Sequence, residues 1–129
     1  MIANKYVQGS VWRWKNDREL KPGVQGGERP VLIISNDKFN ETSVAVNCVT
    51  ITTVIKHSPV HVSAHIDADS EIQCEQIHTI SKTELIEFKG MVPPDILAQV
   101  KAKLRFQLDM YPDMRNSMKI RRRKFKARR

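Results

Sequence analysis

Gln25-Gly-Gly-Glu-Arg29-Pro30-Val-Leu-Ile-Ile-Ser-Asn36 is the stretch that decides the fold, because it predicts a loop that becomes a buried strand. Its adjacent glycines reach backbone conformations closed to other residues, and Pro30 favours an extended backbone at Arg29. The unbroken apolar run 31–34 is short and rich in β-branched residues, which is typical of a strand buried on both faces. Arg29 is therefore expected where the loop becomes the strand. A bidentate cation held there suits a phosphate group, whereas an ion pair with Glu28 is the plainer alternative.

The segments around this stretch predict a mainly β domain: a small, curled β-barrel of five to six strands with a helix packed on it. Strands are expected where β-branched and aromatic residues concentrate between turn signals, at 6–14, 31–34, 43–52, 60–67, 72–80 and 85–92. Pro93-Pro94-Asp95 begins a helix that ends near Tyr111. The apolar face of this helix is formed by Ile96, Leu97, Val100, Leu104 and Leu108.

The histidines do not predict a metal site. Residues 60–67 alternate strictly between apolar and polar side chains, which places His61 and His65 on a solvent-exposed face of a strand. His57, His61 and His65 recur every four residues, but such residues lie about 13 Å apart in a strand. That separation is too large for two ligands of one zinc ion. Because no nucleophile motif, P-loop or metal-binding motif is present either, an enzyme with this sequence is expected to work without metal or cofactor.

The charge of the chain divides it into two parts. With 129 residues, the chain is long enough for one domain with its own core, expected at 1–112. Eight of its 22 basic residues fall in 119–129, which contains no acid, so the net charge of +8 belongs to a basic tail at 113–129. Such a tail binds polyanions by counterion release with little sequence preference. A solvated extension that aids solubility is the plainer reading.

The sequence favours a cytoplasmic protein. No apolar run approaches the length that spans a bilayer, and the first residues lack the apolar core of a signal peptide. In a reducing compartment, Cys48 and Cys74 are expected to remain unpaired.

Polar residues gather at the predicted ends of three strands. Arg29 begins one strand, Thr52, Thr53 and Lys56 follow another, and Glu75, Gln76 and His78 lie on a third. If these ends meet around one concavity, they supply a cation, a hydroxyl donor, a carboxylate and an imidazole. RNA cleavage without a metal needs such a set: a base for the ribose 2′-OH, a cation for the phosphorane and an acid for the leaving oxygen. Taken singly, each residue has an ordinary structural explanation.

Three segments together resemble the MazF/PemK toxins of bacterial toxin–antitoxin systems. They are Gly9-Ser10-Val11-Trp12 with the stretch 25–36, then Thr50-Ile51-Thr52, and then residues 74–82, in the order and spacing of that family. The resemblance implies an SH3-like barrel that forms a homodimer and binds a cognate, MazE-like antitoxin. It also implies a sequence-specific, metal-independent endoribonuclease that cuts single-stranded RNA and leaves a 2′,3′-cyclic phosphate and a 5′-hydroxyl.

The resemblance assigns roles to individual residues. Arg29 and Thr52 match the catalytic positions of the family, and Glu75 matches an acidic residue that some members use. Contacts to RNA are expected from Gln25, Gly27, Thr53, Lys56, Gln76 and His78.

Two residues depart from the family pattern. Ser10 replaces the usual Asp, and His78 replaces an Arg in the late strand. Because histidine titrates near neutrality, His78 predicts a shifted RNA preference or cleavage that changes between about pH 6 and 8. Cleavage that is flat over this range, and unchanged in His78→Arg, would contradict that prediction.

Two alternatives stay open at this point. A CcdB-like poison of DNA gyrase has the same fold, since fold does not fix function, but it needs neither Arg29 nor Thr52. A non-catalytic nucleic-acid-binding module would bind mainly through the basic tail.

Overall fold

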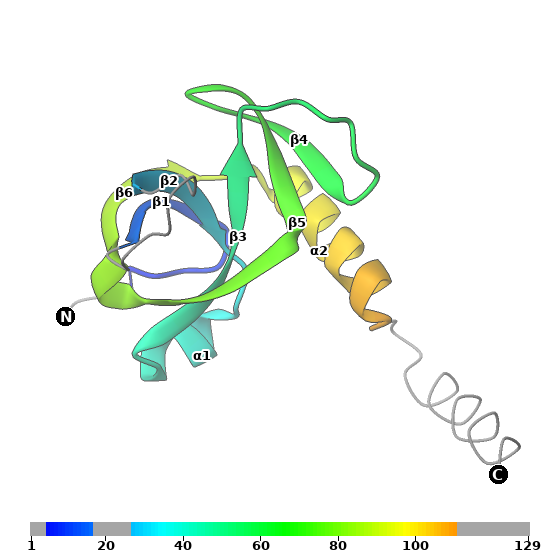
Figure 1. Ribbon diagram of the computed structural model, residues 1–129. Coiled ribbons are helices and arrows are strands. Elements are labelled where there is room, and N and C mark those ends of the chain that lie inside the picture. The colour runs from blue at the N-terminus through cyan, green and yellow to red at the C-terminus, as the bar shows by residue number, and fades with distance from the viewer. Residues whose placement is uncertain (1–4, 17–26, 111–129) are drawn as a thin grey trace, which may run out of the picture.

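The computed structural model describes residues 5–16 and 27–110, which form a single curled sheet with one long helix against it (Figure 1). The elements in chain order are β1 (Ser10–Asn16), β2 (Gly27–Ile33), α1 (Asp37–Thr42), β3 (Ala45–Thr52), β4 (His61–Ile66), β5 (Ala68–Ser81), the short 3₁₀ helix η1 (Lys82–Glu84), β6 (Leu85–Met91) and α2 (Pro94–Leu108). Among the described residues, no helix has the length and apolar character needed to cross a membrane.

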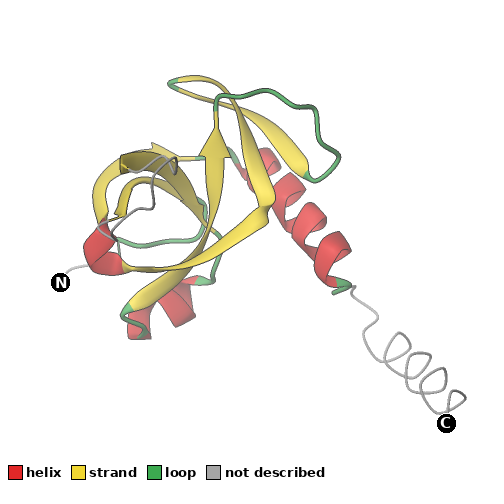
Figure 2. Cartoon of the chain, in the orientation of Figure 1, coloured by secondary structure: helices red, strands yellow, loops and turns green. Residues whose placement is uncertain are grey.

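All six strands belong to one antiparallel sheet in the order β4-β5-β3-β2-β1-β6. The sheet curls strongly, with β2, β1 and β6 on one side of β3 and with β5 and β4 on the other, and α2 lies beside β4 and β5 (Figures 1 and 2). β4 and β6 remain the two edges, so the structure is a half-barrel. The predicted mainly β fold with a C-terminal helix is confirmed.

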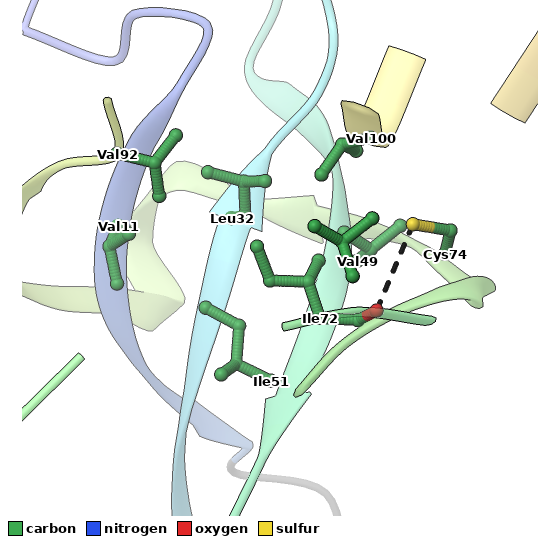
Figure 3. Close-up of a cluster of buried hydrophobic side chains, with 9 residues drawn as sticks. Val11, Leu32, Val49, Ile51, Ile72, Cys74, Val92 and Val100 are labelled. Atoms are coloured by element: carbon green, nitrogen blue, oxygen red, sulfur yellow. Dashed lines mark hydrogen bonds between the residues drawn. The ribbon is translucent and has the colours of Figure 1, made fainter. Parts of the chain in front are cut away.

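Strand β2 separates two apolar cores, which explains its continuous apolar sequence. Val31 and Ile33 pack in one core with both tryptophans, whereas Leu32 packs in the other, shown in Figure 3; all three side chains are fully buried. Successive side chains of a strand point to opposite faces, so a strand with a core on each side must be apolar at every position. The prediction of burial on both faces is confirmed.

β1 continues beyond its predicted C-terminal end, and β2 begins before its predicted N-terminal end. Lys15 pairs with Glu28, and Asn16 pairs with Gly27, so these residues extend the ladder instead of belonging to a loop. Arg29 consequently lies inside β2, opposite Trp14, and the prediction that Arg29 begins the strand is wrong by two residues. Pro30 is tolerated there because β2 pairs with β3 only from Val31 onward.

A bulge of three residues interrupts β5. Val49 of β3 pairs with Ile77, but the next residue, Thr50, pairs with Gln73, so residues 74–76 have no partner on β3. The side-chain amide of Gln107 on α2 donates a hydrogen bond to the backbone carbonyl of Cys74 within this bulge. α2 therefore supplies a hydrogen bond to a backbone carbonyl in the part of β5 that does not pair with β3.

Local signals set the helix boundaries. Asn36 caps α1 by accepting a hydrogen bond from the Phe39 backbone N–H at 2.8 Å. Pro94 begins α2, which ends at Leu108 because Asp109 adopts a left-handed conformation with φ 57°. Within the predicted apolar face, Val100 is fully buried, whereas Leu108, near the end of the helix, is 51% exposed.

Both cysteines are buried and free. Burial raises the pKa of the Cys48 thiol to about 12 and that of Cys74 to about 11. Neither thiol is a reactive group at neutral pH.

Candidate active site

One open pocket brings together three of the residues singled out in the sequence. Arg29, Thr52 and Thr53 line a concavity of about 360 Å³, with Glu28, Pro30, Ile51 and Gln73 completing its wall. Most of the exposed lining is therefore polar or charged, with a guanidinium on one side and hydroxyl groups on the other. Such a concavity suits an anionic, hydrogen-bonding ligand.

The register between β2 and β3 places Arg29 and Thr52 on the same face of the sheet. Val31 pairs with Thr50 in this antiparallel ladder. Two residues further along each strand, in opposite directions, are Arg29 and Thr52, which therefore project from the same face of the sheet. The sequence predicted both residues, and pairing of these strands explains how they come to share a pocket.

Arg29 makes no ion pair with another described residue. Glu28, its plainer partner, pairs instead with Arg13 across β1 and β2, at 3.3 Å between Nη1 and Oε2. The Arg29 side chain is exposed, so its guanidinium is accessible to a ligand in the pocket.

The two threonines of this strand face have different roles. The Oγ1 of Thr52 accepts a hydrogen bond from the Val54 backbone N–H at 3.1 Å, which leaves its own hydroxyl proton to donate into the pocket. Thr50 is buried and donates to Oε1 of Gln73 at 2.7 Å. Gln73, which sequence analysis missed, is thus held in the pocket wall. Its only signal is its register opposite Thr50, which the sequence does not reveal.

Glu75 lies outside this pocket but on the same face of the sheet. Its Oε2 is 2.9 Å from Nε2 of His61, whose Nδ1 is 2.7 Å from Oε1 of Glu71. The side chain of His61 is only 4% exposed, and that of Glu75 is 34% exposed. The prediction of a solvent-exposed His61 is therefore wrong, because the side chains of β5 cover it. His65 is 72% exposed, as predicted.

His61, Glu71 and Glu75 form a cluster in which one imidazole lies between two carboxylates. Burial alone lowers the pKa of His61, but hydrogen bonds to Glu71 and Glu75 outweigh it and raise that pKa above its usual value. The hydrogen bond from His61 lowers the pKa of Glu71, aided by the backbone N–H groups of His57 and Lys56 and opposed by burial. The interaction between His61 and Glu71 therefore favours the charged form of each group.

The remaining predicted RNA-binding residues lie in different places. Lys56 is exposed in the loop 53–60, and Gln76 is exposed in the β5 bulge. His78 is half-buried, with its ring 5.2 Å from that of Trp14. Gly27 is the first residue of β2, with φ 104°, and Gln25 lies outside the described residues, as does the segment 113–129.

Ser10, the first departure from the family pattern, has a structural role. It is fully buried, donates to the Val7 carbonyl at 2.6 Å and accepts a hydrogen bond from the Trp12 indole at 2.9 Å. A short hydroxyl satisfies both partners within the space available. An Asp there would bury a charge next to a carbonyl oxygen.

In residues 5–16 and 27–110, no group of three or more His, Cys, Asp and Glu side chains is arranged to hold a metal ion. His61 lies within hydrogen-bond distance of Glu71 and Glu75, so both of its ring nitrogens are already engaged by carboxylates.

Comparison with known proteins assigns the family. Residues 8–108 match the model of the PemK-like, MazF-like toxins of type II toxin–antitoxin systems. The endoribonuclease EndoA of Bacillus subtilis is 34% identical over 100 residues, which cover 70% of this chain and 86% of that protein. Two solved structures, each 25% identical, cover 81% of this chain and 96% of their own: MazF from Deinococcus radiodurans, with a TM-score of 0.66, and an endoribonuclease from a mycobacterial species in complex with its cognate antitoxin, with a TM-score of 0.68. The chain belongs to the family of PemK-like, MazF-like toxins of type II toxin–antitoxin systems.

Proposed function

We propose that this toxin is a sequence-specific, metal-independent endoribonuclease that cuts single-stranded RNA and leaves a 2′,3′-cyclic phosphate and a 5′-hydroxyl. The observation that carries the proposal is the single open pocket lined by both Arg29 and Thr52. A 34% identical relative is an endoribonuclease, which supports the same reaction class. A gyrase poison needs neither residue, and the comparisons favour the nuclease over that alternative.

Arg29 would bind the scissile phosphate and stabilise the charge that develops on it. As the ribose 2′-oxygen attacks phosphorus, the phosphorane gains negative charge on its non-bridging oxygens. A guanidinium offers these oxygens two parallel hydrogen bonds at fixed geometry. Thr52 would donate its hydroxyl proton to another phosphate oxygen, since its acceptor lone pair already binds Val54.

Glu75 is proposed as the base that removes the 2′-OH proton. Its carboxylate is partly exposed and lies on the same face as Thr52 and Gln73. The 5′-oxygen leaves with a proton donated by a protonated group, a role open to Arg29 or to solvent. The bases of unstacked RNA would contact Gln25, Gly27, Thr53, Lys56, Gln76 and His78.

We also propose that the protein acts in the cytoplasm as a homodimer controlled by a cognate, MazE-like antitoxin. The mycobacterial endoribonuclease, solved with its cognate antitoxin, supports this partner class. The basic tail at 113–129 would add sequence-independent attraction to RNA.

The decisive experiment is incubation with mixed-sequence single-stranded RNA in EDTA, followed by mapping of the cut positions and of the end groups. Cleavage at a recurrent short sequence with cyclic-phosphate ends is expected. Arg29→Ala should fold normally and cleave about a hundred- to a thousandfold more slowly. Arg105→Ala, which removes an exposed arginine from α2, is the matched control and should cleave normally. Normal cleavage by Arg29→Ala would refute the assignment.

A further inference from the structure

A single buried carboxylate holds the loop that follows Thr52. Glu71 is only 1% exposed. Its Oε1 accepts the backbone N–H of Lys56 at 3.2 Å, and its Oε2 accepts that of His57 at 2.9 Å. Two consecutive N–H groups of the loop 53–60 are therefore bound to the two oxygens of one side chain. This contact fixes the middle of the loop to the sheet.

The same carboxylate is bound by a buried imidazole that also reaches Glu75. His61 contacts Glu71 through Nδ1 and Glu75 through Nε2, at 2.7 and 2.9 Å. An ionised carboxylate can only accept hydrogen bonds, so both contacts are satisfied together when both ring nitrogens carry protons. An imidazolium between two carboxylates forms two charge-assisted hydrogen bonds, which fix the positions of both partners.

This cluster adjoins the pocket of Arg29. Glu71 pairs with Thr52, and His61 pairs with Gln73, so the three strands place the cluster and the pocket on one face. Thr52, Thr53 and Gln73 line the pocket itself. The loop held by Glu71 starts at Thr53 and carries Lys56. The conformation of the loop 53–60 therefore sets the position of Thr53 and of the residues after it at the edge of the pocket.

We propose that Glu71 and His61 are positioning residues for RNA cleavage: they hold the loop 53–60 against the sheet at the edge of the pocket and orient the carboxylate of Glu75. Neither residue needs to touch RNA. The proposal rests on the proposed endoribonuclease function for its catalytic consequence, whereas the ordering of the loop stands independently. It also gives a reason for burying a glutamate and a histidine where an apolar pair would pack as well.

The test compares the full chain with Glu71→Gln, with the double variant Glu71→Leu/His61→Leu, and with His65→Gln as control. The double variant removes both buried charges together, which avoids leaving one of them unpaired if Glu71→Gln alone folds poorly. His65 lies on β4, as His61 does, and contacts the carboxylate of Asp69 at 3.0 Å, but its side chain is exposed. Hydrogen exchange of the Lys56 and His57 amides reports on the loop. The amides of Val49 and Ile72, in the central strands, are the internal reference for global stability.

In both cluster variants, the Lys56 and His57 amides should exchange about tenfold faster or more relative to the reference amides. Cleavage at a mapped site should fall about ten- to a hundredfold. KM should rise because the loop 53–60 is less well ordered, and kcat should fall because the carboxylate of Glu75 is less well oriented. His65→Gln should match the wild type in both measurements. Unchanged exchange would overturn the proposed ordering of the loop, and normal kcat and KM despite faster exchange would overturn the positioning role. If the wild type itself cleaves no RNA, the proposed function fails, and exchange still decides whether Glu71 holds the loop.

Discussion

Two threonines on one strand face provide a direct test of the proposed chemistry. Thr50 and Thr52 both project toward the face of Arg29, and replacing either by Val removes a hydroxyl while nearly conserving shape. Only Thr52 lines the pocket, whereas Thr50 is buried against Gln73. The same substitution should therefore affect catalysis at one position and stability at the other.

The magnitudes follow from the contacts of each hydroxyl. A hydrogen bond from Thr52 to a charged phosphate is worth about 1.5–3 kcal/mol, so Thr52→Val should slow cleavage about ten- to a hundredfold. Its stability should change by less than about 1 kcal/mol, because water can replace the acceptor of the exposed Val54 N–H. Thr50→Val leaves the Gln73 oxygen without its donor, at a cost of about 1–3 kcal/mol.

Urea denaturation and cleavage rates measured on the same preparations separate the two effects. Thr50→Val should lower the unfolding free energy by the stated amount and cleave within a few-fold of wild type when assayed well below its Tm. Thr52→Val should show the reverse pattern. Wild-type cleavage by Thr52→Val would refute a catalytic hydroxyl at this position. A large activity loss in Thr50→Val alone would place the critical hydroxyl two residues earlier.

Three further predictions concern the fold and its charges. Leu32→Ala should lower the unfolding free energy by about 2–5 kcal/mol because this side chain is fully buried. Leu108→Ala, at a half-exposed site, should lower it by less than about 1 kcal/mol. Equal unfolding midpoints of the two variants in urea would contradict the described core. Gly27→Ala should lower the unfolding free energy by about 1–2 kcal/mol because alanine disfavours the positive φ at this position. A Cβ there meets no atom within 4 Å, so no steric clash adds to this cost. An unchanged unfolding free energy would show that the backbone relaxes. The stability contributed by His61 should be complete below about pH 6.5 and be lost as pH rises through its raised pKa, while that of Glu71 should be complete above about pH 4.3 and be lost as pH falls through its lowered pKa. The unfolding free energy should therefore be highest between these values, and an unfolding free energy that varies with pH in the same way in Glu71→Leu/His61→Leu would contradict this origin.

The parts of the fold that depend on local chemistry were predictable from the sequence. The apolar run at 31–34, the cap at Asn36 and the proline at the start of α2 each act on the residues beside them. That Arg29 and Thr52 line one pocket was also within reach, because the resemblance singles out both residues.

The parts that depend on strand register were not predictable. Alternation along 60–67 identified the two faces of β4 but not what covers them, so His61 was assigned to solvent. Gln73 enters the pocket, and Glu71 becomes buried, only because β5 pairs with β3 on one side and β4 on the other. The bulge at 74–76 shifts that register by three residues, and no local signal marks it.

The double burial of β2 has a consequence for how Arg29 and Thr52 come to share a face during folding. A slip of this strand by one residue would exchange Leu32 with its β-branched neighbours and leave both cores apolar, so hydrophobicity alone barely opposes it. The same slip would turn Arg29 away from Thr52. Alignment must instead come from the fit of individual side-chain shapes and from anchoring bonds such as that from Gly9 N–H to the Ile33 carbonyl, at 2.8 Å. Enzymatic activity would then report whether the strand has locked into the correct alignment, a distinction that burial of apolar surface alone would not make.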